Sequence, residues 1–271
     1  MRAAFFALNT HIMYYLVQSN IHSDPDHHKI FQALEDLGLD YEAIELNSAT
    51  QAIGLKADRK DVFVYGSVKL ARLAKENTDW YPGSFYGGNH LFEVYAPHYK
   101  NNLLNYEAQV FRFADPIEWR PDETKFIKPY KDAKIFTGRV FTKTKWEDFV
   151  RSSLENPKTP MLTGASLVQA SRPQPIIKEA RLWIVGGSVV AAVYYRFHDD
   201  AVFESEVAPE GIGFARAMVE VFNVAEAFVM DICLTADGWK IVEINCINSA
   251  GFFPNLNVKS LVRALDVYFS R

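Results

Sequence analysis

Three polar residues near the C-terminal end of the sequence have the types and spacing of ligands for a hard divalent cation. Asp231 lies in one apolar stretch, Glu243 and Asn245 lie in a second, and a turn signal at Asp237-Gly238 separates the two. A hairpin bent at this turn places Asp231 nearly opposite Glu243, and Asn245 shares the face of Glu243 because side chains alternate along a strand. Carboxylates in apolar strands are costly unless a cation offsets their charge, and these oxygen ligands suit Mg²⁺ bound jointly with phosphate. The alternative is a solvated hairpin face without a metal.

A basic segment in the middle of the chain carries groups that suit a phosphate. Lys128 lies in a predicted strand, Phe126-Ile127-Lys128-Pro129, where a purely structural sequence would favour an apolar residue. Lys134, Thr137 and Gly138 follow in a loop whose backbone amides and hydroxyl could approach a phosphate. The segment is not a P-loop, because it lacks the glycine-rich Lys-Ser/Thr pattern. The alternative is a charge at the edge of a strand.

Glu179 and Arg181 form a third candidate set, because they share one face of a predicted apolar strand. A carboxylate there could bind the hydroxyls of a ribose, and a guanidinium could hold a phosphate through two parallel hydrogen bonds. The alternative is an ion pair between these two side chains. No convincing Ser-His-Asp or Cys-His set suggests a protein nucleophile.

Alternating strands and helices precede these groups. Over the first 90 residues, periodicity and capping signals predict strands at 11–18, 41–46 and 61–66, a helix that starts near Ser23-Asp24-Pro25 and stops at Gly38, and a helix at 68–76. This β-α-β-β-α order is typical of a small open α/β lobe. A segment rich in Pro, Gly and aromatic residues, 80–88, is predicted to connect this lobe to the remainder.

The remainder is predicted to mix helices with antiparallel hairpins. Gly186-Gly187 permits the positive φ angles of a tight turn, and Asp237-Gly238 is interpreted in the same way. The predicted elements are strands at 125–129 and 139–142, a helix at 146–154, a hairpin over 181–197, a helix at 213–227, a hairpin over 227–245 and a helix at 258–269. The fold class is therefore mixed α/β (α+β).

The composition is that of a soluble globular protein with room for about two domains. Of the 271 residues 49% are hydrophobic, and the net charge of −4 gives no electrostatic reason to expect a nucleic-acid partner. No apolar run approaches the length of a membrane span, and residues 3–8 lack the features of a signal peptide. Cys233 and Cys246 are expected as reduced thiols, so the predicted location is the cytoplasm.

Three histidines offer a competing metal site. His22, His27 and His28 are close in sequence, but they lie at the start of a predicted helix, where a solvated or capping role is favoured.

The order of these motifs along the chain resembles that of the ATP-grasp superfamily, over nearly the whole sequence. In that family a strand lysine is followed by a flexible loop over the phosphates, an adenine-binding hinge, an acidic ribose ligand, and finally an acidic residue and a Glu-x-Asn that bind the metals. The resemblance implies these assignments: Lys128 as the strand lysine, 134–138 as the loop, Gln169, Ala170 and Ser171 in the hinge, Glu179 as the ribose ligand, and Asp231, Glu243 and Asn245 as metal ligands. It also implies ATP and Mg²⁺, with Mn²⁺ as an alternative metal.

Three segments are similar, more narrowly, to the clade of this superfamily that is named for one arginine and two lysines and occurs in bacteria and their phages. These segments read Phe-Ile-Lys-Pro with Lys-Ile-Phe-Thr-Gly-Arg, Glu-Ala-Arg-Leu-Trp-Ile-Val-Gly-Gly, and Val-Glu-Ile-Asn with Ser-Ala-Gly. We assign the arginine to Arg181 and the lysines to Lys128 and Lys134. The resemblance implies a pre-grasp lobe over 1–90 and an ATP-grasp domain over 91–271, with the nucleotide between its two subdomains.

The activity that the resemblance implies is ATP-dependent ligation of a carboxylate to an amine, or to a thiol, through an acyl phosphate. Lys128 and Arg181 are the expected catalytic residues, and an amide or peptide bond forms with release of ADP and phosphate. Two alternatives stay open, a phosphotransferase on the same scaffold and a nucleotide-binding module without catalysis.

The expected partner is a small molecule, an amino acid or a peptide, and no membrane is expected. The pre-grasp lobe and residues 248–252 are expected to shape its site. Four further residues either line that site or simply pack together: Tyr81, Phe85, Tyr86 and His90.

Overall fold

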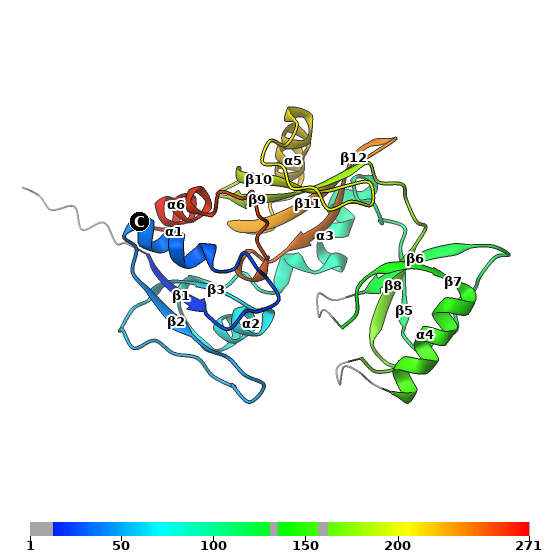
Figure 1. The fold of residues 1–271 in the computed structure, drawn as a ribbon, viewed down its shortest axis with the longest axis horizontal. Helices are drawn as coiled ribbons and strands as arrows, with labels where there is room; N and C mark the ends of the chain where they lie inside the picture. The colour runs from blue at the N-terminus through cyan, green and yellow to red at the C-terminus, as the bar shows by residue number, and fades with distance from the viewer. Residues whose placement is uncertain (1–12, 131–134, 157–161, 271) are drawn as a thin grey trace, which may run out of the picture.

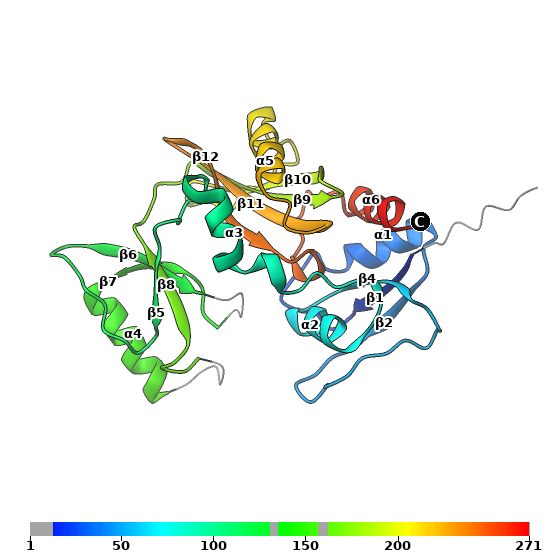
Figure 2. The ribbon, with the colours of Figure 1, turned by 180° about the vertical axis from the view of Figure 1, so that it is seen from behind.

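The computed structural model describes residues 13–130, 135–156 and 162–270. Within these ranges the chain forms three four-stranded sheets (Figures 1 and 2). A parallel sheet lies at the N-terminal end, an antiparallel sheet lies at the centre, and a second antiparallel sheet forms a lobe on the far side of the molecule. The mixed α/β class predicted from the sequence is confirmed.

The N-terminal elements are β1 (Tyr14–Gln18), α1 (Lys29–Leu37), β2 (Tyr41–Ile44), β3 (Asp61–Tyr65), α2 (Val68–Asn77) and β4 (Tyr81–Gly83). The strands are parallel in the order β2-β1-β3-β4. The predicted β-α-β-β-α order is confirmed, and β4 is an additional strand inside the predicted connector. Gly38 ends α1 with φ 64°, the left-handed conformation that glycine adopts readily.

α1 begins later than predicted, at Lys29 instead of at the Ser23-Asp24-Pro25 signal. The Asp24 carboxylate accepts hydrogen bonds from the backbone N–H groups of Asp26, at 2.9 Å, and Phe252, at 3.0 Å. Asp24 therefore stabilises a turn and a contact with a distant loop in place of a helix start.

The central elements are α3 (Phe92–Tyr99), β9 (Lys178–Val185), β10 (Ser188–Phe197), α5 (Pro209–Val221), β11 (Ala227–Thr235) and β12 (Gly238–Asn245). The strands are antiparallel in the order β10-β9-β11-β12. Gly186 and Gly187 form the turn between β9 and β10 with φ 56° and 75°, as predicted. α5 begins and ends earlier than the predicted 213–227, because Pro209 suits the first helical turn and Phe222 has an extended backbone.

The far lobe contains β5 (Gln109–Arg112), β6 (Thr124–Pro129), β7 (Arg139–Thr142), α4 (Lys143–Glu155) and β8 (Leu167–Ser171). We call it the third lobe; its antiparallel strands have the order β5-β8-β6-β7. α4 covers one face of this sheet, where Ile127 is fully buried among apolar side chains. Alternation along β6 directs Lys128 to the opposite face, toward the central sheet.

The two faces of the central sheet differ in character. One face is largely apolar and is buried against α3 and α5. The other face is apolar only in the half near α6 (Val258–Phe269), where Trp183 and Val229 belong to the cluster that contains α6 and the N-terminal lobe. Arg181 and Asp231 lie on the same face, because each is two residues from Trp183 or Val229 along its strand. We call the part of this face that carries Arg181 and Asp231 the charged half-face.

The largest apolar cluster joins both ends of the chain. α6 packs on α1, and residues of β1 and β3 share this cluster with residues of β9 and β11. Short 3-10 helices complete the described elements: η1 (Gly88–His90), η2 (Lys100–Asn102) and η3 (Ile247–Ser249). Because the core is continuous across residue 90, the division into 1–90 and 91–271 stays a prediction. No helix in the described ranges is long and apolar enough to cross a membrane.

Candidate active site

Asp231 and Glu243 lie directly opposite each other in the β11-β12 hairpin, as predicted. The turn itself differs from the prediction, because Thr235 already pairs with Gly238, which leaves Ala236 and Asp237 as the two turn residues. That turn alone would pair Asp231 with Val242. A β-bulge, which shifts the register between Ile232 and Asp231, makes Glu243 the partner instead.

Arg181 pairs with Asp231 across the neighbouring strands β9 and β11. Its Nε and Nη2 atoms donate to the two carboxylate oxygens of Asp231 at 2.8 Å and 2.7 Å, which is a bidentate ion pair. Nη1 donates to the carbonyl oxygen of Gly251 at 3.2 Å, and the guanidinium lies 5.1 Å from the ring centre of Phe253. Arg181 therefore joins the charged half-face to the loop that follows η3.

Lys128 reaches the same cluster from the third lobe. Its Nζ atom lies 3.2 Å from Oε2 of Glu243. The Nδ2 atom of Asn245 donates to Oδ2 of Asp231 and to Oε1 of Glu243, both at 3.2 Å. Five of the residues singled out in the sequence thus form one cluster between the central sheet and the third lobe: Lys128, Arg181, Asp231, Glu243 and Asn245.

The cluster combines two cations with two carboxylates. Burial raises the pKa of Asp231, and the Arg181 guanidinium opposes this shift. Burial also acts to raise the pKa of Glu243, but Lys128 and Arg181 outweigh it, and the pKa of Glu243 falls below its ordinary value. Burial acts to lower the pKa of Arg181, but Asp231 outweighs it and raises that pKa. Glu243 and Arg181 are therefore both charged at neutral pH.

The oxygen atoms of this cluster suit a hard cation such as Mg²⁺. One carboxamide, that of Asn245, lies between the carboxylates of Asp231 and Glu243. Rotation of this carboxamide would present its oxygen in place of its nitrogen, so that three oxygen ligands converge. Among the described residues no group of three His, Cys, Asp or Glu side chains could hold a metal ion, and Asn245 is the candidate for a third protein ligand because it contacts both carboxylates.

Glu179 lies on the same face, one row further toward the turn of β11 and β12, opposite Cys233. Its oxygens accept hydrogen bonds from Tyr195 Oη at 2.6 Å and from Arg196 Nη1 at 2.9 Å. The alternative of an ion pair between Glu179 and Arg181 is therefore wrong, because each pairs with another residue. Burial, with the Glu179 charge, raises the pKa of the Cys233 thiol to about 12. Cys233 and Cys246 are both buried, and they do not form a disulfide with each other.

The predicted hinge residues are divided between the two faces of β8. Gln169 is buried opposite Lys128, and its Oε1 atom accepts a hydrogen bond from Asn105 Nδ2 at 2.8 Å. Ala170 points to the opposite face, into the apolar cluster under α4. Asn105 was not predicted, because a single polar residue in a connecting segment gives no periodic signal.

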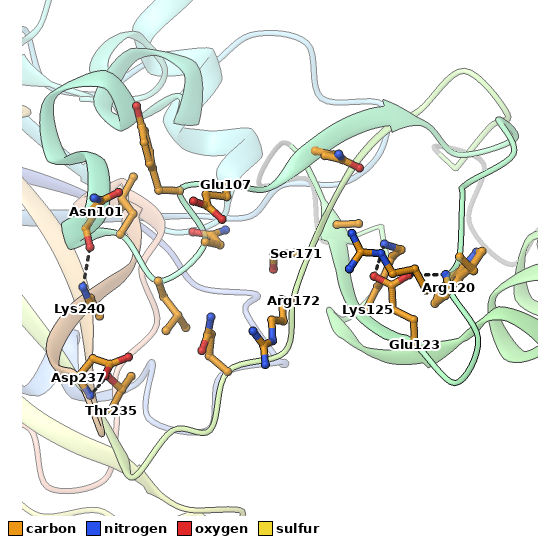
Figure 3. A pocket seen from close by; sticks show the side chains of 18 of the residues that line it. Asn101, Glu107, Arg120, Glu123, Lys125, Ser171, Arg172, Thr235, Asp237 and Lys240 are labelled. Carbon is orange, nitrogen blue, oxygen red and sulfur yellow. Dashed lines mark hydrogen bonds and ion pairs between the residues drawn. The ribbon is translucent and has the colours of Figure 1, made fainter.

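A cavity of about 850 Å³ lies beside this hinge. Figure 3 shows Ser171 and Arg172 between Lys240 of β12 on one side and Lys125 of the third lobe on the other. The residues that line it include neither Lys128 nor the three candidate metal ligands. The hinge cavity and the charged cluster therefore occupy different parts of the space between the central sheet and the third lobe.

The segment before β7 is described only from residue 135 onward, so Lys134, the second predicted phosphate lysine, lies outside the described residues. Thr137 and Gly138 directly precede β7. A Cβ atom on Gly138 would lie 2.8 Å from Cβ of Lys128 and 2.9 Å from the ring of Phe126, which is closer than real Cβ atoms approach. Glycine is therefore needed for the close approach of this segment to Lys128.

Among the described residues, the three histidines near the N-terminus belong to no group of side chains that could hold a metal ion. His27 Nε2 is hydrogen-bonded to the carbonyl oxygen of Gln18, and its ring stacks on Tyr65 with 5.5 Å between ring centres. His28 Nδ1 is hydrogen-bonded to the carbonyl oxygen of Pro25. His27 is buried, so the predicted solvated role is wrong for it, and His28 makes no side-chain capping hydrogen bond at the start of α1.

Two of the four residues named as possible lining of a substrate site, Tyr81 and Phe85, pack on α6. Tyr81 and Phe85 contact the ring of Phe269, with ring centres 6.0 Å and 5.9 Å apart. His90 is largely buried, and its Nε2 atom has no hydrogen-bond partner among the described residues. The packing alternative accounts for Tyr81 and Phe85.

His90 gives a prediction about pH and stability. Burial lowers its pKa from 6.5 to about 4, so the folded state resists protonation where the unfolded chain accepts a proton. We expect the free energy of unfolding to fall as the pH decreases from about 6.5 to about 4, with His90 contributing roughly 2 to 3 kcal/mol to that fall. Urea unfolding of the wild type and of His90→Gln across this range measures the contribution. Parallel pH dependences in the two proteins would contradict it.

The arrangement of two facing antiparallel sheets, with a lysine on one and acidic residues on the other, is that of the ATP-grasp class. Residues 74–265 match the family described as ATP-grasp domain, R2K clade family 3. The chain therefore belongs to the R2K clade of ATP-grasp proteins. A comparison with curated proteins gave no match.

Solved structures of ligases are similar in fold. D-alanine–D-alanine ligase from Bacillus anthracis has a TM-score of 0.61 at 12% identity, over 95% of this chain and 94% of that chain. D-cycloserine synthetase has a TM-score of 0.60 at 13% identity, over 95% and 99%. A macrocyclase from Microcystis aeruginosa, bound with its precursor peptide, has a TM-score of 0.56 at 11% identity, over 94% and 99%. At these identities the similarity shows the shared fold.

Proposed function

We propose that this protein is an ATP-dependent ligase that joins a carboxylate to an amine, or to a thiol, through an acyl phosphate. The main support is the contact of 3.2 Å between Lys128 and Glu243, which places a cation of the third lobe against a candidate metal ligand of the central sheet. Membership of the ATP-grasp family and the fold shared with known ligases support the same reaction class.

The residues of the cluster have separate proposed roles. Asp231, Glu243 and Asn245 would hold Mg²⁺, which neutralises phosphate charge when it is bound. Lys128 and Arg181 offset negative charge as a substrate carboxylate attacks the γ-phosphorus of ATP and ADP leaves. The amine then attacks the acyl carbon, an amide forms, and phosphate leaves. Lys128 and Arg181 need only bind and orient these groups, since no step requires a protein nucleophile.

The nucleotide would extend from this cluster along the interface toward the hinge. Glu179, already oriented by Tyr195 and Arg196, keeps lone pairs that could accept ribose hydroxyls. Gln169, Ala170 and Ser171 would lie near the base, with Thr137, Gly138 and Lys134 over the phosphates. We place the reaction in the cytoplasm, where the thiols of Cys233 and Cys246 would stay reduced.

A product analysis tests this proposal. The purified protein is incubated with ATP and Mg²⁺ over a panel of amino acids and short peptides, and ADP and phosphate release are followed. Mass spectrometry then identifies the product. A ligase is expected to give a condensed product and free phosphate in equal amounts. A phosphorylated acceptor without free phosphate would instead indicate a phosphotransferase, and nucleotide binding without turnover on any acceptor would favour a binding module.

A further inference from the structure

Within the described ranges, a few side-chain contacts join the third lobe to the rest of the molecule. Two chain segments, 103–108 and 172–177, connect this lobe to the central sheet, and both lie near the same end of β8. Rotation about that end would move Lys128 relative to Glu243. Contacts further from it therefore have the greatest effect on where Lys128 lies.

Two of the contacts across the interface are poorly placed to fix this orientation during turnover. The bond from Asn105 to Gln169 starts in one of the connecting segments, so it restricts rotation only weakly. The contact from Lys128 to Glu243 is between groups that the proposed function assigns to phosphate and metal, so it would be exchanged when a nucleotide binds.

A third contact lies at the other end of β8. Tyr130 directly follows β6, and its backbone N–H donates to the carbonyl oxygen of Leu167, the first residue of β8. Its hydroxyl donates to Oε2 of Glu93 at 2.6 Å, and its ring contacts Phe92 edge-on with 6.3 Å between ring centres. Burial, together with the bond to Glu93, raises the pKa of Tyr130 to about 12, so the phenol stays a donor at neutral pH.

The acceptor of this hydrogen bond, Glu93, is on a helix that packs against the central sheet. Glu93 is in the first turn of α3. Tyr95, Ala96 and Tyr99 of the same helix are buried against the central sheet. The bond thus connects the residue two positions after Lys128 to a helix that packs against the central sheet, which carries the charged half-face.

We propose that Tyr130 and Glu93 are positioning residues, whose hydrogen bond keeps the third lobe where Lys128 can contact nucleotide phosphate above the charged half-face. This inference rests on the proposed function, because it assumes that the cluster binds a nucleotide. Neither residue is expected to contact the reacting atoms.

The test is Mg·ADP binding by isothermal titration calorimetry to the full chain. Tyr130→Phe and Glu93→Ala are each expected to weaken binding by about three- to tenfold, the effect of one net hydrogen bond. The double variant is expected to be no weaker than either single variant, because both changes remove the same bond. Glu93→Gln keeps an acceptor oxygen and is expected to bind nearly as well as the wild type.

A matched control comes from the N-terminal lobe. Tyr41 donates to Glu35 at 3.0 Å, a bond of the same type that crosses no interface with the third lobe. Tyr41→Phe is expected to leave Mg·ADP affinity unchanged. The thermal midpoint of all variants is expected to stay near that of the wild type, so a loss of affinity is not a loss of folding.

Two results would overturn the inference: wild-type affinity in Tyr130→Phe, or losses in the two single variants that add in the double variant. Failure of the wild type itself to bind Mg·ADP would instead reject the proposed function, and this inference with it. If the wild type binds Mg·ADP and one of the first two results is found, this inference fails while the proposed function stands.

Discussion

Lys128→Met is expected to lower the rate of ATP-dependent ADP release by about 10²- to 10³-fold while the protein stays folded. β6 directs Lys128 at the charged half-face, and its Nζ atom is 3.2 Å from Glu243. Methionine is unbranched and apolar and can replace the packing of the lysine stem, so the change removes mainly the charge. ADP release with an accepted substrate, together with circular dichroism and the thermal midpoint, measures both parts of the prediction.

Lys259→Met is the matched control for this variant. Lys259 is on α6, and its Nζ atom lies 3.2 Å from Oδ2 of Asp36 on α1, an ion pair that involves neither the third lobe nor the hinge cavity. The control loses the same charge at a distance from the cluster, so its rate is expected to stay near that of the wild type. Near-normal turnover in Lys128→Met would move the active site away from β6.

Glu243→Gln is expected to reduce turnover by a similar factor, about 10²- to 10³-fold, and to raise the Mg²⁺ concentration needed for half-maximal rate. The pKa of Glu243 is below its ordinary value because Lys128 and Arg181 outweigh burial, so the wild-type side chain is an anion at neutral pH. Glutamine keeps the shape of the side chain and removes that charge. A titration of rate against Mg²⁺ separates weaker metal binding from a general loss of activity.

Glu220→Gln is the matched control. Glu220 is an exposed residue of α5, the helix on the opposite face of the central sheet, so this variant makes the same change of charge away from Lys128. Its Mg²⁺ dependence is expected to match that of the wild type. If Glu243→Gln and Glu220→Gln behaved alike, Glu243 would have no special role with the metal.

The β11-β12 hairpin shows which features of a strand pair are readable from the chain. The alternation of apolar and polar residues and the turn-forming residues are local properties, so they predict two antiparallel strands with Asp231 near Glu243. The register is not local. The turn residues are Ala236 and Asp237, and a bulge near Val242 then restores the opposition of the two carboxylates. Nothing in the residue types around Val242 indicates that bulge.

Glu179 and Arg181 illustrate the same limit for side-chain pairing. Their spacing places them on one face of β9, but it does not select their partners. Arg181 pairs with Asp231, 50 residues away, and Glu179 pairs with Arg196 across the β9-β10 hairpin. Both pairings follow from the strand order, because β9 lies between β10 and β11 in the sheet.

Motif order, strand alternation and turn glycines were enough to predict the family, many of the elements and the residues of the charged cluster, because each of these is a property of neighbouring residues. They did not predict α3, β5 or β8. The folded chain was needed for contacts between distant segments, such as Lys128 with Glu243 across 115 residues and Tyr130 with Glu93 across 37. The physical reason is that these contacts depend on how whole sheets pack against one another. That packing is the sum of many weak apolar interactions, so the residue types at the two contacting positions do not predict the contact.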